Sequence, residues 1–285
     1  MTWQLAIVLF FVSTTIGGIL RRKFSKTTNH DAGLISFVQH GGVILPLGIL
    51  WSLTQSVHFS FSSAVHFWIF TLCAAIAGVV FNILSFKSQK TVDAGQFAII
   101  GNLSTPLVVL LSVLLLHESL SGYQLLGMMC ILGGASVVIG SPKNTKAALQ
   151  KHVWYAVIAA VLTGVTIIVE RYAIKASSVV VYILIGWLIQ AVILAIFTRK
   201  KLHTARTISR SELLHIGMMG TARFGSFVMF LTAVKLSGNV SLMSTISSFR
   251  TVSICAASFV FLNERDRLWQ KLLGAVVATL GLFLM

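Results

Sequence analysis

Long runs of apolar residues, separated by short polar loops, set the strongest limit on how this chain folds. Residues 5–20, 69–84, 105–116 and 240–262 form runs with almost no charged side chain. A helix needs about 20 mostly apolar residues to cross a bilayer core, and only helices or closed barrels satisfy their backbone there. The runs are too continuous for the alternating pattern of a membrane barrel. The sequence therefore predicts an all-α integral membrane protein.

Composition and charge exclude several other classes. Only 10% of the 285 residues are charged, against about 25% in soluble domains. The net charge of +15 comes from basic residues in short loops, where membrane topology requires them, so we expect no nucleic-acid partner. Cys73, Cys130 and Cys255 lie in apolar runs without metal-ligand spacing, and buried cysteine usually behaves as a small hydrophobe. We expect no metal, cofactor or disulfide.

Hydropathy predicts ten transmembrane helices, which we place at residues 3–20, 33–53, 65–86, 93–116, 121–140, 153–173, 178–198, 212–235, 239–262 and 267–285. The start of the chain lacks the basic segment and cleavage site of a signal peptide, so the first run should remain as a helix. A polar linker at residues 141–151 divides the helices into two units of five, at residues 1–140 and 152–285.

The two units repeat one motif about 147 residues apart. The first copy is Leu116-His-Glu118, Leu125-Leu126-Gly127 and Gly134, and the second is Leu262-Asn-Glu264, Leu272-Leu273-Gly274 and Gly281. Such spacing indicates a duplicated unit. An acid just before a helix favours its positive N-terminus, and glycines seven apart share a helix face that packs closely. We therefore interpret the motif as a packing and capping feature rather than a substrate site.

The distribution of basic residues predicts how the two units are inserted. Of the 22 Lys and Arg residues, 17 fall on one side, at positions 21, 22, 23, 26, 87, 90, 143, 146, 151, 199, 200, 201, 206, 210, 265, 267 and 271. Positive loops stay in the cytoplasm, which puts both termini outside the cell membrane. Because each unit has an odd number of helices, the second crosses in the opposite sense, giving an inverted repeat.

These features resemble the EamA-type branch of the drug/metabolite transporter superfamily. The likeness is strongest over residues 93–139, with Pro106 followed by HESLSGYQLLG. The matching segment of the second unit, FLNERDRLWQKLLG, has one extra residue between the glutamate and the glycine. The resemblance covers essentially the whole chain. It implies a secondary transporter that moves small metabolites, often outward, through a central cavity by alternating access.

Two arginines inside predicted spans are the leading candidates for substrate binding. Arg223 and Arg250 lie near the middle of the predicted helices 212–235 and 239–262. An arginine there costs about 2.5–3.5 kcal/mol on insertion scales, and such residues usually mark function. Guanidinium groups bind carboxylate or phosphate in a two-pronged geometry, so we expect an anionic group on the substrate. Neutralisation of the arginines by Glu170 or by backbone carbonyls is the open alternative.

Six further residues at mid-membrane levels are candidates for the same site: Gln39, His40, Asn82, Asn102, Trp187 and Gln190. Trp187 and Gln190 are three apart and share a helix face. His40 titrates near neutral pH and would suit a coupling proton. Polar side chains also simply join helices in bundles, and that structural role is the alternative for each.

The leading functional hypothesis is a secondary active transporter that exports a small anionic or zwitterionic metabolite. A lipid-carrier flippase of the same fold is the alternative. A membrane enzyme is less favoured, because the seven acidic residues form no catalytic cluster. Small multidrug-resistance proteins depend on a glutamate in the first helix, and residues 3–20 contain no acid. Expected partners are membrane lipids and a small molecule, and the sequence is compatible with a coupling proton and a homodimer.

Overall fold

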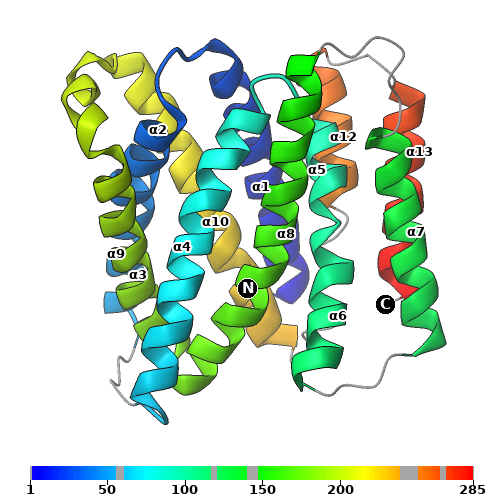
Figure 1. Ribbon diagram of the computed structural model, residues 1–285, viewed down its shortest axis with the longest axis horizontal. Helices are drawn as coiled ribbons and strands as arrows, with labels where there is room; N and C mark the ends of the chain where they lie inside the picture. Colours follow the sequence, from blue (N-terminus) through cyan, green and yellow to red (C-terminus); the bar gives the residue numbers. More distant parts are fainter. Residues whose placement is uncertain are drawn as a thin grey trace.

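The computed structural model describes residues 2–55, 61–116, 121–139, 147–237, 250–263 and 268–284, and within these ranges it contains helices but no strands (Figure 1). The α-helices are α1 (Trp3–Thr27), α2 (Ala32–Gln39), α3 (Leu45–Leu53), α4 (Ala64–Ser88), α5 (Ala94–Gly101), α6 (Ser104–Leu116), α7 (Gly122–Ile139), α8 (Ala147–Ala176), α9 (Val179–Thr198), α10 (Arg210–Ser237), α12 (Arg250–Phe261) and α13 (Leu268–Leu284). A π-helical turn, η1 (His40–Ile44), joins α2 to α3, and a 3₁₀ helix, η2 (Arg199–Thr207), follows α9. The predicted all-α fold is confirmed.

Seven helical segments are long and apolar enough to cross a membrane: Trp3–Thr27, Ala32–Leu53, Ala64–Ser88, Ala94–Leu111, Lys151–Ala176, Val179–Thr207 and Arg210–Phe230. Shorter apolar helices lie at Leu125–Val137 and Arg250–Phe261. The protein is therefore a multi-pass membrane protein. The count of ten spans stays a prediction, because residues 238–249 of the ninth predicted helix lie outside the described residues. Glu118, Glu264 and linker residues 141–146 also lie outside the described residues.

Helix α1 is longer than the sequence predicted. Hydropathy ends the first span at residue 20, but the helix continues to Thr27 and ends where Thr28 becomes extended. Arginine and lysine are good helix formers, and cations are favourable near a helix C-terminus. Arg21 and Arg22 therefore belong to the helix and not to the loop that hydropathy predicts after residue 20.

Two predicted helices are interrupted. The helix predicted at 33–53 widens into the π-helical turn η1 just before Pro46, whose ring lacks an N–H group and crowds the preceding turn of an α-helix. The helix predicted at 93–116 is split at Asn102 and Leu103 into α5 and α6. Pro106 then falls in the first turn of α6, where proline is tolerated.

Contacts between helices follow a symmetric pattern. The most extensive pairs are α4 with α8, α1 with α10 and α7 with α13, and α9 packs on α2 and α3 while α5 packs on α12. If the first to fifth helical segments are matched to the sixth to tenth, the α4–α8 pair corresponds to the α1–α10 pair. The α7–α13 pair, the contact of α9 with α2 and α3, and the α5–α12 pair each correspond to themselves. The start of α1 and the end of α13 lie toward the same face in Figure 1. The opposite face carries Lys87, Lys90, Lys151 and Lys201, and we call it the basic face.

The glycines of the repeated motif hold α7 against α13. A Cβ atom added to Gly134 would lie 2.6 Å from the carbonyl oxygen of Gly274, and one added to Gly281 would lie 2.5 Å from the carbonyl oxygen of Gly127. The second glycine of each copy thus contacts the first glycine of the other copy. The packing role predicted for these glycines is confirmed.

Gly134→Ala tests this packing. The new methyl group forces the two backbones apart, which should cost about 1–3 kcal/mol of stability and lower the apparent midpoint of thermal unfolding in detergent. The neighbouring Gly133 is exposed and has no atom within 4 Å of an added Cβ. Gly133→Ala should be neutral, or stabilising by up to about 1 kcal/mol through helix propensity. Equal effects of the two substitutions would contradict the packing role.

Candidate substrate-binding site

Two cavities lie within the helix bundle. The basic-side cavity, of about 290 Å³, extends toward the basic face and includes Gln89 and Ala94 in its lining. The far-side cavity, of about 360 Å³, extends toward the other face and includes Ile44 and Tyr182. Four residues line both cavities: Phe81, Thr163, Arg223 and Arg250. Both predicted arginines therefore lie at the junction of the two cavities.

Arg223 projects from α10 toward α4. Its Nη1 atom donates a short hydrogen bond to Oδ1 of Asn82, and its Cζ atom lies 5.7 Å from the centroid of the Phe81 ring. Asn82 is buried, and its Nδ2 group has no hydrogen-bond partner within the described part of the chain. The hydrogen bond from Arg223 to Asn82 therefore fixes the orientation of the guanidinium, and the Phe81 ring gives it a cation–π contact.

Arg250 is the first described residue of α12 (Arg250–Phe261) and is the more open of the two arginines. Its side chain is exposed, lines both cavities and makes no hydrogen bond or ion pair with any residue that the structure describes. The next residue, Thr251, is buried and donates a hydrogen bond to Oδ1 of Asn102 at 3.1 Å. Asn102 lines neither cavity. Its hydrogen bond with Thr251 joins the end of α5 to α12. This contact matches the helix-joining role that is the alternative to substrate binding for Asn102.

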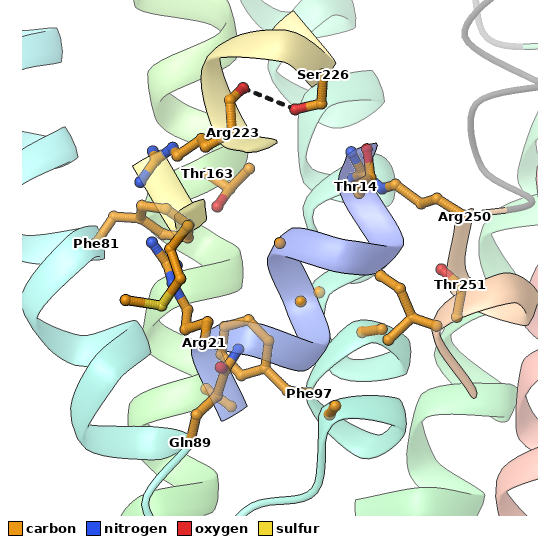
Figure 2. Close-up of a pocket in the computed structure, with 18 of the residues that line it drawn as sticks. Thr14, Arg21, Phe81, Gln89, Phe97, Thr163, Arg223, Ser226, Arg250 and Thr251 are labelled. Atoms are coloured by element: carbon orange, nitrogen blue, oxygen red, sulfur yellow. Dashed lines mark hydrogen bonds between the residues drawn. The ribbon is translucent and has the colours of Figure 1, made fainter. Parts of the chain in front are cut away.

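A third arginine, Arg21, lines the basic-side cavity. Its Nη2 atom donates to Oε1 of Gln39 at 3.4 Å, and its Cζ atom lies 4.6 Å from the Phe86 ring centroid. Figure 2 shows Arg21 and Arg223 on the same side of the cavity near Phe81, and Arg250 entering from another side near Thr14. Arg21 is close enough to Arg223 for the two charges to interact. Sequence reasoning missed Arg21 because hydropathy placed it beyond the end of the first helix.

The predicted residues His40, Trp187 and Gln190 all line the far-side cavity. The ring nitrogen Nε2 of His40 lies 3.1 Å from the carbonyl oxygen of Trp187, and since a carbonyl only accepts, this nitrogen is the donor. The Trp187 ring packs edge-on against Phe224 and Phe227, with ring centroids 6.4 and 5.3 Å apart. These contacts form an aromatic wall beside the Gln190 amide.

One acidic residue, Glu170 of α8, lines the far-side cavity. Its Oε1 atom accepts a 2.7 Å hydrogen bond from the hydroxyl of Tyr182. Glu170 and Arg223 attract each other electrostatically, but neither Arg223 nor Arg250 takes part in an ion pair with any described residue. Among the described residues, Glu170 therefore forms no ion pair that would neutralise either arginine.

An ion network lies at the basic end of the basic-side cavity. Arg22 of α1 contacts Oδ1 of Asp93 at 3.2 Å, and Lys271 of α13 makes a short ion pair with Oδ2 of the same carboxylate. Arg22 also donates to the backbone oxygen of Gln89 at 2.5 Å. The side chains of Arg22 and Lys271 are 6% and 8% exposed. Asp93 thus balances two buried cations and joins α1 and α13 at the start of α5.

Comparison with known proteins gives a family match along nearly the whole chain. A sequence model of the EamA-like transporter family matches residues 1–140 and, a second time, residues 150–285. A search of curated proteins finds no match. Among solved structures, 27 chains match. One, described only as a crystal structure of a protein, has 15% sequence identity and a TM-score of 0.66, with 99% of this chain and 96% of that chain covered. At this identity the likeness shows the fold alone.

Asp93→Asn tests the ion network. The substitution removes the carboxylate that contacts both Arg22 and Lys271, and breaking a buried pair in this way costs about 3–5 kcal/mol. We expect a marked fall in the midpoint of thermal unfolding of the purified protein.

Asp31→Asn is the matched control. Asp31 also precedes a helix and pairs with Lys201 at 2.6 Å, but the lysine side chain is 55% exposed. Asparagine caps a helix about as well as aspartate, and an exposed ion pair contributes about 0–1 kcal/mol. A loss at position 93 no larger than that at position 31 would show that the Asp93 network is not a structural tie.

Proposed function

The chain belongs to the EamA-like transporter family, and from that premise we propose that it carries a small anionic or zwitterionic metabolite across the cell membrane. Its two family matches make it a membrane transporter of the drug/metabolite type. The class of substrate, its export from the cell and its binding near Arg223 and Arg250 are our proposal.

The observation that carries the proposal is the cluster of arginines around the two cavities. Arg21, Arg223 and Arg250 contribute three positive charges, and Glu170 is the one acid in the described lining. A charged side chain within a membrane is costly unless water or a partner of opposite charge meets it, and guanidinium groups match carboxylate or phosphate oxygens. An anionic substrate supplies the missing negative charge.

The remaining candidate residues divide between positioning and contact. In the proposal, Arg223 and Arg250 hold the acidic group, and Asn82 keeps Arg223 in place. Gln39 does the same for Arg21. Trp187, Gln190 and His40 contact the rest of the substrate from the far-side cavity. Trp187 offers a flat apolar surface and Gln190 both a donor and an acceptor.

Alternating access is the proposed mechanism. The two cavities extend toward opposite faces and share Phe81, Thr163, Arg223 and Arg250, so one binding position serves both sides. We assign the repeats to residues 1–140 and 152–285, with residues 141–151 as a cytoplasmic linker whose last five residues form the start of α8. The symmetric helix contacts support an inverted pair of five-helix units that rock about the site. The basic face would lie in the cytoplasm and both termini outside.

A ligand screen measures the substrate class directly. A compound that binds the folded state raises the unfolding midpoint, by about 2.7 kcal/mol of stability at 100 times its dissociation constant. We expect anionic or zwitterionic metabolites to stabilise the purified protein and cationic ones to have no effect. Stabilisation confined to cations would overturn the proposal. Stabilisation confined to phosphate-headed lipids would favour the lipid-carrier flippase.

The double substitution Arg223→Gln and Arg250→Gln should abolish transport of the best-stabilising anion into proteoliposomes. Each hydrogen-bonded charge contributes about 1.5–3 kcal/mol, so we expect binding to weaken at least about 100-fold while the protein stays folded. Arg206→Gln is the control, because Arg206 is exposed in η2 and lines neither cavity. Normal transport by the double variant would show that the arginines are structural.

A further inference from the structure

Glu170 differs from the other acidic residues that the structure describes. Asp93, Asp31 and Glu212 each pair with a cationic or titratable partner: Asp93 with Arg22 and Lys271, Asp31 with Lys201, and Glu212 with His30. Glu170 instead lines the far-side cavity, six residues before the end of α8, and takes part in none of these pairs. A carboxyl group in such a position needs a role beyond helix capping or surface charge.

The immediate contacts of Glu170 leave one carboxyl oxygen open. Oε1 accepts the hydroxyl hydrogen of Tyr182, which is 6% exposed. Oε2 has no hydrogen-bond partner within the described ranges. Tyr182 belongs to a buried apolar cluster that includes Phe67, Ala74 and Val181. The carboxyl group is thus held at one oxygen beside this cluster, and its other oxygen can carry a proton.

The charged and titratable groups that face Glu170 come from several helices. Around the far-side cavity they are His40 of η1, Tyr182 of α9, Arg223 of α10 and Arg250 of α12. The described lining residues of α4 are Ala74, Gly78 and Phe81, none of which titrates, and α5 and α6 contribute no described residue to the lining. Elsewhere on α4, His66 stacks on Phe70 and contacts Ser63. Arg171 and Lys175 of α8 are exposed.

We propose that Glu170 is the coupling-proton site, which takes up one proton when an anionic substrate binds the cavity arginines. This inference rests on the proposed function. Without substrate, the ionised carboxylate of Glu170 supplies the negative charge that attracts Arg223 across the cavity. When a substrate anion occupies the arginines, two negative charges face Arg223. A proton from solution then adds to the open oxygen of Glu170, with no other bond formed or broken.

This competition between the substrate anion and the Glu170 carboxylate for Arg223 couples substrate transport to proton transport. The anion binds best to the protonated protein, and by thermodynamic reciprocity the proton binds best to the anion-loaded protein. The substrate and one proton therefore cross together and are released together, so that the outward gradient of the substrate drives export and carries the proton with it. His40 is the other titratable candidate, but its Nε2 donates to the Trp187 carbonyl oxygen, and it carries no negative charge that an anion would repel. The geometry favours Glu170.

Sulfate binding across a pH series tests the coupling. Sulfate stays doubly charged over the range from about pH 5 to about pH 9, in which protein carboxyls with perturbed environments titrate. Purified full-length protein in nanodiscs is titrated with sodium sulfate at constant ionic strength, and proton uptake is read with an indicator dye. In the wild type, we expect sulfate affinity to be about tenfold higher at the acidic end, within the usual range of coupling between sites, together with proton uptake.

Three variants identify the group responsible. Glu170→Gln should bind sulfate tightly at every pH and take up no proton, whereas His40→Gln should keep the wild-type pH dependence. Tyr182→Phe removes the hydroxyl that stabilises the carboxylate and should move the midpoint of the pH dependence upward. Retention of the pH dependence in Glu170→Gln, or its loss in His40→Gln, would overturn the proposal. Failure of Glu170→Gln to bind sulfate at any pH would instead count against the arginine site itself.

Discussion

The cost of placing a guanidinium group inside a bilayer governs the rest of this structure. Each such group needs water, an acceptor or an anion within reach. Arg21 and Arg223 each have one amide acceptor and one aromatic ring, and Arg250 has no partner among the described residues. Two cavities beside these arginines meet the remaining need. The arginines therefore require the cavities, and the packing of the helices leaves this space open beside them.

Close packing elsewhere makes that space available. The motif glycines bring the backbones of α7 and α13 into direct contact, so this pair forms a compact unit that contributes no described residue to either cavity lining. The cavities instead lie among α1, α2, η1, α4, α5, α8, α9, α10 and α12. Both helix interruptions occur beside them. The π-helical turn follows Gln39 and contains His40, and the break after α5 frees Asn102 to accept from Thr251. Irregular backbone is tolerated at membrane depth where it lines a cavity or is buried in protein.

Hydropathy and charge were sufficient to predict the helical fold and two of the cavity arginines, because an arginine stands out within an apolar run. They were not sufficient for Arg21. Its position just after an apolar run looks the same whether the helix ends there or continues for two more turns. The same patterns could not separate Asn82, which contacts Arg223, from Asn102, which contacts Thr251. That distinction depends on which helices are neighbours, and sequence spacing alone does not determine it.

Arg21 also changes what the asymmetry between the two units means. Arg223 and Arg250 belong to the second unit and have no charged counterpart in the first, so the sequence placed the whole cationic site in one unit. Arg21 adds a charge from the first unit, on a helix that packs along α10. A ligand can shift a conformational equilibrium only if its affinity differs between the two states. In the proposed mechanism, an anion that contacts both units has such a difference, because the change of access alters the separation of Arg21 from Arg250. An anion held by the second unit alone would move with that unit and favour neither state. In the proposed mechanism, sharing the charges between the units is therefore what allows substrate binding to drive the change of access.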